Sequence, residues 1–109
     1  QKSGTTVGLE AGMTLTVEPG FYRADEFGIR HENLCEVVCC GDGWLRLESM
    51  AFVPFNRHLI DAEMLTPVEQ AWVDEYHRQV YARVSPMLDN DELVAWLEAA
   101  TQPLTGHRS

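Results

Sequence analysis

The sequence MTLTVEPG at residues 13–20 decides the fold, because apolar and polar side chains alternate along it until Pro19-Gly20. Such alternation is typical of a β-strand with one buried face, and a Pro-Gly pair predicts a turn. A second strand candidate covers residues 29–40, and Gly41-Asp42-Gly43 then predicts a turn into a third strand at residues 44–52. The first half of the chain is therefore predicted to form an antiparallel meander.

From about residue 65 the pattern is helical. Thr66-Pro67-Val68-Glu69 is a capping box with proline at the first helical position, so two signals for a helix start coincide. Four-residue spacing predicts one buried apolar stripe on a helix that ends at Pro86, and its members are Val68, Trp72, Tyr76, Val80 and Val84. Asp89 is expected to open a second helix, with inward-facing side chains at Leu93, Trp96, Leu97 and Ala100. We therefore expect an α+β fold, an antiparallel sheet followed by two C-terminal helices.

Composition narrows the classes of partner. The 109 residues hold 8 basic and 17 acidic side chains, a net charge of −9, which argues against nucleic acid or an anionic membrane surface. No run of apolar residues is long enough to span a bilayer, and the opening residues lack the pattern of a signal peptide. Three cysteines, Cys35, Cys39 and Cys40, show no zinc-site spacing and predict free thiols in a reducing, cytoplasmic compartment.

Glu18 and Glu32 form the pair best suited to bind a metal ion. On strict alternation Thr16 and Glu18 share one face of the first strand, and Arg30 and Glu32 share one face of the second. If the strands pair with both carboxylates on the same side, two like charges meet a few ångströms apart, which favours a proton or a cation between them. A hard divalent ion suits carboxylate oxygens. Two solvated strand residues remain the alternative from the residues alone.

Two neighbours fit the same site. Arg30 can hold a carboxylate through paired hydrogen bonds, and Tyr22, just past the predicted turn, can hydrogen-bond into it. Each also has a structural interpretation, as a surface arginine or a packed tyrosine. None of the four histidines shows ligand spacing, and His77 is predicted on the polar side of the long helix. The tryptophans Trp44, Trp72 and Trp96 are predicted to be core residues.

Two motifs in the first half resemble those of the pita-bread metallopeptidases. Residues 9–22, LEAGMTLTVEPGFY, are similar to the family's L-x-x-G-M-x-x-T-x-E-P-G-x-Y segment, and residues 27–34, FGIRHENL, resemble the G-I-R-x-E strand that follows it. Residues 52–61, FVPFNRHLID, are similar to the C-terminal extension of the longer Xaa-Pro aminopeptidases, which prolidases generally lack. The resemblance implies that residues 1–54 are the C-terminal portion of a pita-bread catalytic domain and residues 55–109 its helical extension.

The same resemblance implies a two-metal hydrolase that cleaves the N-terminal Xaa-Pro bond of peptides with proline in second position. In that family two aspartates, one histidine and two glutamates hold two divalent cations, usually manganese. Glu18 and Glu32 match the two glutamates, while Arg30 and Tyr22 match residues that hydrogen-bond around the ligands. Glu18 is also expected to help move a proton to or from the attacking water. The other three ligands would lie before Gln1, so the 109 residues alone are expected to be inactive.

Two other functions remain open at this point. One is a prolidase-like dipeptidase, which the C-terminal extension disfavours. The other is a pita-bread module that binds partners or dimerises without catalysis, against which the presence of both Glu18 and Glu32 argues. The helical half carries more apolar surface than a short meander can cover, so a homodimer is expected, with Trp72 or Trp96 as its anchor.

Overall fold

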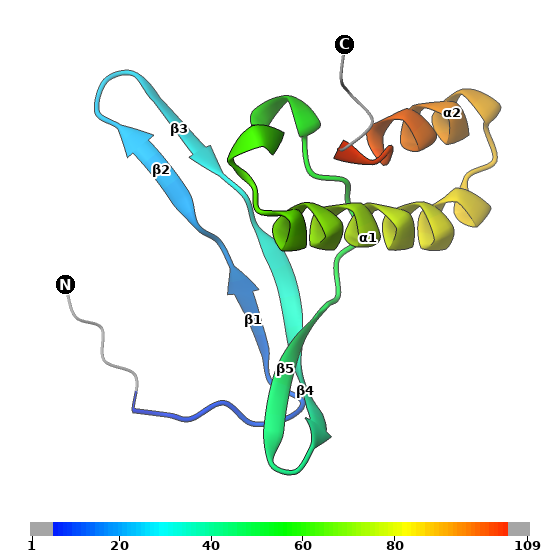
Figure 1. Ribbon diagram of the computed structural model, residues 1–109. Helices are drawn as coiled ribbons and strands as arrows, with labels where there is room; N and C mark the ends of the chain where they lie inside the picture. Colours follow the sequence, from blue (N-terminus) through cyan, green and yellow to red (C-terminus); the bar gives the residue numbers. More distant parts are fainter. Residues whose placement is uncertain (1–5, 105–109) are drawn as a thin grey trace. The chain divides into compact units, whose positions relative to one another are not determined.

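A computed structural model of the protein describes residues 6–104 (Figure 1). The chain divides into two compact units, Gln1–Ala51, here called the strand unit, and Phe52–Ser109, the helical unit. The predicted α+β class, an antiparallel sheet followed by two helices, is confirmed. Among the described residues, no helix is both long and apolar enough to cross a membrane.

The strand unit is built from five antiparallel strands. They are β1 (Thr14–Val17), β2 (Gly20–Arg23), β3 (Phe27–Arg30), β4 (Asn33–Gly41) and β5 (Trp44–Ser49). β1, β4 and β5 form a three-stranded sheet with β4 in the centre, and β2 pairs with β3. The side chains of Asn33, Cys35 and Val37 are buried, so alternate residues of β4 share one buried face, as the two-residue period of a strand predicts.

The predicted turn at Pro19-Gly20 is wrong. Val17 pairs with Asn33 and Gly20 pairs with Arg30, so β1–β4 and β2–β3 follow one continuous register. The chain instead reverses at residues 24–26, at the far end of this long ribbon (Figure 1). Proline has no backbone N–H to donate to the ladder, so Pro19 interrupts the strand without turning it. Its carbonyl still accepts a hydrogen bond from the His31 N–H at 3.2 Å.

The second predicted turn is confirmed. Asp42 and Gly43 have φ values of +52° and +78°, as a two-residue hairpin loop with both central residues in the left-handed region requires. Gly41 pairs with Trp44 across this loop, and the register shifts between Cys39 and Gly41. Cys40 is therefore the extra residue of a β-bulge. The prediction of free thiols also holds, because Cys35, Cys39 and Cys40 form no disulfide.

The helical unit contains α1 (Pro67–Val84) and α2 (Asp91–Ala100), with short 3₁₀ turns at Arg57–Leu59 (η1), Ala62–Met64 (η2) and Ser85–Met87 (η3). The predicted capping box is present, since Thr66 N donates to Glu69 Oε2 at 2.8 Å and Glu69 N donates to Thr66 Oγ1 at 3.3 Å. The hydrogen bonds that the Thr66 backbone N–H and hydroxyl donate to the Glu69 carboxylate lower the pKa of Glu69. α2 begins after Asn90 rather than at Asp89, because the Asn90 side chain accepts from the N–H groups of Glu92 and Leu93.

The core of the helical unit is centred on Tyr76, Val80 and Leu97. Half-buried side chains pack against this cluster from the rest of the unit, namely Phe52, Phe55, Tyr81, Val84 and Leu88. The prediction of one continuous stripe along α1 is wrong at its N-terminal end, where Val68 is 80% and Trp72 54% exposed. Residues spaced by four advance about 40° around a helix of 3.6 residues per turn. A stripe of five such residues therefore leaves the buried face.

Two further predictions about the helices are wrong. His77 was placed on the polar side of α1 but is fully buried, because the inward face is centred on Tyr76, His77 and Val80. In α2 only Leu97 of the four predicted inward residues is buried, and Trp96 is 62% exposed. Trp44, Trp72 and Trp96 are all exposed in this chain, so the prediction of tryptophans in the core is also wrong.

Candidate metal centre

Glu18 and Glu32 stand at the interruption of the long β-ribbon. Glu18 directly follows β1 and Glu32 directly precedes β4. Glu18 lies opposite Glu32 in the register. On one side Val17 pairs with Asn33, and on the other His31 N donates a hydrogen bond to Pro19 O. Opposed residues of an antiparallel ladder point to the same face, with Cβ atoms about 4.5–5.5 Å apart. The ladder thus brings the two predicted carboxylates to one face of the ribbon.

Arg30 joins this pair to Tyr22. Its Nη1 lies 3.4 Å from Glu18 Oε2, and its Nε donates a hydrogen bond of 2.8 Å to the Tyr22 hydroxyl. The guanidinium also lies over the tyrosine ring, 5.7 Å from the ring centroid. The pKa of Arg30 is raised, first by its hydrogen bond and electrostatic interaction with Tyr22, and then by the negative charges of Glu18 and Glu32. Arg30 therefore forms an ion pair with Glu18 and a hydrogen bond with Tyr22.

Two glycines make room for the Tyr22 ring. A Cβ atom at Gly20 would lie 2.5 Å from the Tyr22 hydroxyl oxygen, and one at Gly28 would lie 2.7 Å from the ring carbon Cδ1. Gly28 pairs with Tyr22 across the β2–β3 ladder, and Gly20 pairs with Arg30. The ring can therefore lie across the strands and present its hydroxyl to Arg30. Sequence reasoning missed this role, because Gly28 is recognised as the partner of Tyr22 only once the strands are paired.

Thr16 is a second contact that sequence reasoning missed. Its hydroxyl donates to Glu18 Oε1 at 3.3 Å, while Arg30 engages Oε2 of the same carboxylate. Thr16 and Glu18 are two residues apart, so strand alternation places their side chains on one face. The two oxygens of Glu18 thus have different partners, one from its own strand and one from the opposite strand. Such contacts fix the orientation of a carboxylate before it binds a ligand.

The donor set fits part of a divalent cation site. Carboxylate oxygens suit Mn²⁺ or Mg²⁺, and two of them meet on one face here. Within residues 6–104, however, no group of three or more His, Cys, Asp or Glu side chains is placed to hold a metal ion. The described residues therefore offer two opposed carboxylates but no complete metal site.

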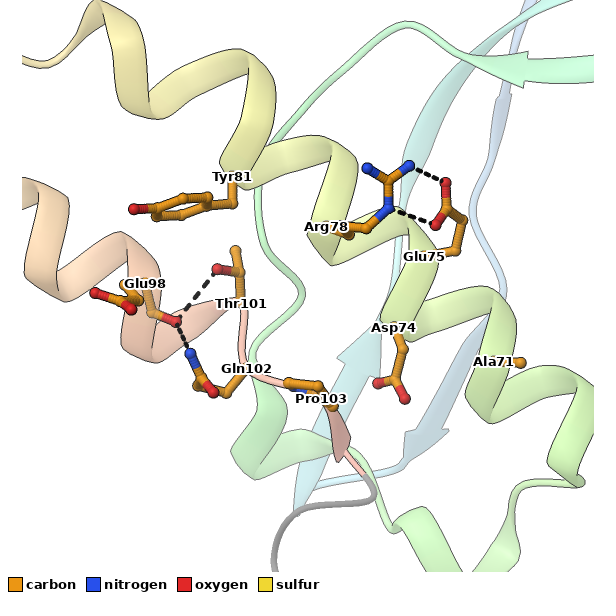
Figure 2. Close-up of a pocket in the computed structure, with 9 residues that line it drawn as sticks. All are labelled: Ala71, Asp74, Glu75, Arg78, Tyr81, Glu98, Thr101, Gln102 and Pro103. Carbon is orange, nitrogen blue, oxygen red and sulfur yellow. Dashed lines mark hydrogen bonds and ion pairs between the residues drawn. The ribbon is translucent and has the colours of Figure 1, made fainter.

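A pocket in the helical unit lies between α1 and α2 and has a volume of about 560 Å³ (Figure 2). Its polar side chains hydrogen-bond mainly within the unit, since Asp74 Oδ1 accepts from Leu104 N at 2.7 Å and Thr101 Oγ1 donates to Leu97 O at 2.7 Å. Hydrogen bonds from Arg78, and then from Gln79, lower the pKa of Glu75 to about 2. The pocket contains none of the predicted site residues.

Comparison with known proteins identifies the family. Residues 1–38 match the description "Metallopeptidase family M24", and residues 43–104 match "C-terminal region of peptidase_M24". The chain belongs to metallopeptidase family M24. This M24 chain is 44% identical over 108 residues to a probable Xaa-Pro aminopeptidase P of Arthroderma benhamiae, covering 90% of the chain and 15% of that protein. A second relative, from Coprinopsis cinerea and of the same name, is 41% identical over 104 residues, with coverage of 88% and 17%.

A solved structure resembles the M24 chain closely. It is the crystal structure of an X-prolyl aminopeptidase from Caenorhabditis elegans, described as a cytosolic enzyme with a di-nuclear active site. The TM-score is 0.83 at 31% sequence identity, and the match covers 94% of this chain and 18% of that chain. The predicted resemblance to pita-bread aminopeptidases is thus confirmed. The chain spans 15% to 18% of the length of these relatives.

Proposed function

We propose that this chain is the C-terminal part of a metal-dependent aminopeptidase that hydrolyses the N-terminal Xaa-Pro bond of peptides with proline in second position. The observation that carries the proposal is the placement of Glu18 opposite Glu32, with Arg30 paired to Glu18. Relatives that match about nine-tenths of the chain are named Xaa-Pro aminopeptidase P, which supports this substrate class.

Each site residue has a proposed role. Glu18 and Glu32 would hold two divalent cations, Mn²⁺ by our proposal, together with ligands from another part of the protein. Such ions lower the pKa of a bound water and polarise the scissile carbonyl. Arg30 fixes one oxygen of Glu18, and Tyr22 in turn holds Arg30. Glu18 is the group proposed to accept or return the proton of the attacking water.

The two halves of the chain are assigned to different regions of the protein. Residues 1–54 form the C-terminal portion of the catalytic domain, and residues 55–109 form a helical extension. The division of the chain after Ala51 supports a boundary in this region. A cytoplasmic location is proposed by similarity to the cytosolic enzyme of Caenorhabditis elegans. A prolidase-like dipeptidase is disfavoured, because the match to Xaa-Pro aminopeptidases extends through the helical unit.

We expect a full-length protein that contains these residues to be active and the 109-residue chain alone to be inactive. With added Mn²⁺, a full-length protein that contains these residues is expected to release the N-terminal amino acid from a peptide with proline in second position. The 109-residue chain is expected to release none, because two carboxylates cannot complete the coordination of two ions. Release is measured by chromatography of the products. If the 109-residue chain cleaved the peptide and Glu32→Ala abolished that cleavage, the site in this chain would be complete, contrary to this prediction.

We also propose that the chain forms a homodimer through the exposed aromatic surface of the helical unit. Trp72 stacks on Tyr76 with ring centroids 5.6 Å apart and is more than half exposed, as is Trp96 on α2. Large exposed aromatic side chains are typical anchors of protein interfaces. Sedimentation is expected to show a species of about twice 12.3 kDa at micromolar concentration, and Trp72→Ala or Trp96→Ala is expected to weaken it. A monomer at that concentration would refute the dimer.

A further inference from the structure

His77 is a fully buried histidine that holds the backbone of a neighbouring segment. Its Nε2 accepts a hydrogen bond of 3.0 Å from the Phe55 N–H. A nitrogen that accepts from an N–H group carries no proton, so the imidazole is neutral and its single hydrogen is on Nδ1. Nδ1 has no hydrogen-bond partner among the residues that the structure describes. The geometry therefore requires one protonation state and one tautomer.

The neighbouring residue of α1 holds the same segment. The Tyr76 hydroxyl accepts from Val53 N at 3.3 Å and donates to Val53 O at 2.9 Å. The Phe55 ring packs on both α1 residues, with centroids 5.0 Å from Tyr76 and 6.2 Å from His77. Residues 52–56 are here called the latch segment. Two consecutive side chains of α1 thus hold two of its residues, Val53 and Phe55. This segment opens the helical unit directly after the strand unit ends at Ala51.

Protonation of His77 conflicts with this arrangement. With a proton on Nε2, the ring N–H and the Phe55 N–H would both be donors facing each other, so the Phe55 amide would lose His77 as its acceptor. The pKa of His77 is lowered, first by burial and then by the positive charge of Arg57 in η1, while Asp74 in α1 opposes the shift. These are the charged groups that act on the ring from the elements around it. The closed segment therefore excludes the imidazolium form.

We propose that His77 is an acid-sensitive latch, whose protonation releases residues 52–56 from α1. The closed state binds no proton at His77, whereas an open state exposes the ring to water, where a histidine titrates near pH 6.5. The latch is thus fully effective above about pH 6.5 and weakens as the pH falls below it, by up to about tenfold per pH unit. Between pH 7.5 and pH 5.5 the ratio of open to closed molecules should rise about tenfold.

Hydrogen exchange of the Phe55 amide, followed by NMR in the 109-residue chain, tests this proposal. Its protection factor, corrected for the intrinsic pH dependence of exchange, is expected to fall about tenfold from pH 7.5 to pH 5.5. The variant H77Q is the critical control, because the glutamine side-chain oxygen can accept from the Phe55 N–H at any pH. It should keep protection independent of pH. The variant H58Q, at an exposed histidine of η1, should behave as the wild type does.

Two results would overturn the latch. One is a Phe55 protection factor in the wild type that does not change over this pH range. The other is an equal pH response in H77Q, which would assign the effect to another group. If H77Q does not fold, the ¹⁵N chemical shifts of the His77 ring in the wild type decide the matter. They should report a neutral ring with hydrogen on Nδ1 at pH 7.5, and a ring protonated at pH 7.5 would contradict the proposal.

Discussion

Leu97→Ala is expected to lower the free energy of unfolding of the helical unit by about 2–5 kcal/mol, the usual range for removing a buried leucine side chain. Leu97 is 2% exposed and packs with Tyr76 and Val80 in the core of the unit. The truncation removes three methylene-sized groups from a close-packed site and leaves a cavity that neighbouring side chains fill only in part. Urea unfolding followed by circular dichroism at the helix signal measures the loss.

Leu93→Ala is the matched control for this change. Leu93 lies one helical turn earlier on α2 and is 49% exposed, so the same truncation is expected to cost less than about 1 kcal/mol. Equal losses at the two positions would show that Leu93 is as buried as Leu97, as sequence periodicity predicted.

The sequence predicted the kinds of element well but not where the long ribbon reverses. The turn at Asp42-Gly43 and the capping box at Thr66 were predictable, because each depends on residues a few positions apart. The reversal at residues 24–26 was missed, because Pro19-Gly20 is the stronger local turn signal. Whether a Pro-Gly pair turns a strand or only interrupts it depends on pairing with the distant β3 and β4. Local chemistry does not contain that information.

Side-chain burial was predicted less well than element type. Four-residue spacing chose Val68 and Trp72 as core, while the buried face includes His77, a residue that periodicity treats as polar. The reason is specific to this fold, since a backbone N–H of Phe55 satisfies the imidazole and offsets the cost of burying it. Only the position of the latch segment, some twenty residues away in sequence, reveals this partner.

In the candidate site, too, some features were predicted from the sequence and others were not. Strand parity placed Glu18, Arg30 and Glu32 on common faces, and the register agrees with that arrangement. The contacts that orient them were not predicted, because they depend on the register itself. The space for Tyr22 between Gly20 and Gly28, and the hydrogen bond from Thr16, are visible only once the strands are paired.

Glu32→Gln in the full-length protein tests most directly whether the Glu18–Glu32 pair holds the catalytic metal ions. The neutral amide keeps the shape of the side chain but lacks the negative charge that would hold a divalent cation. Bound metal and kcat/KM should therefore both fall by more than about a hundredfold, beyond the loss typical of residues that only support a ligand. Glu36→Gln, four residues along β4, should change neither. The predicted result is loss of metal and of Xaa-Pro cleavage with unchanged circular dichroism. Wild-type activity and metal content in Glu32→Gln would contradict the metal site.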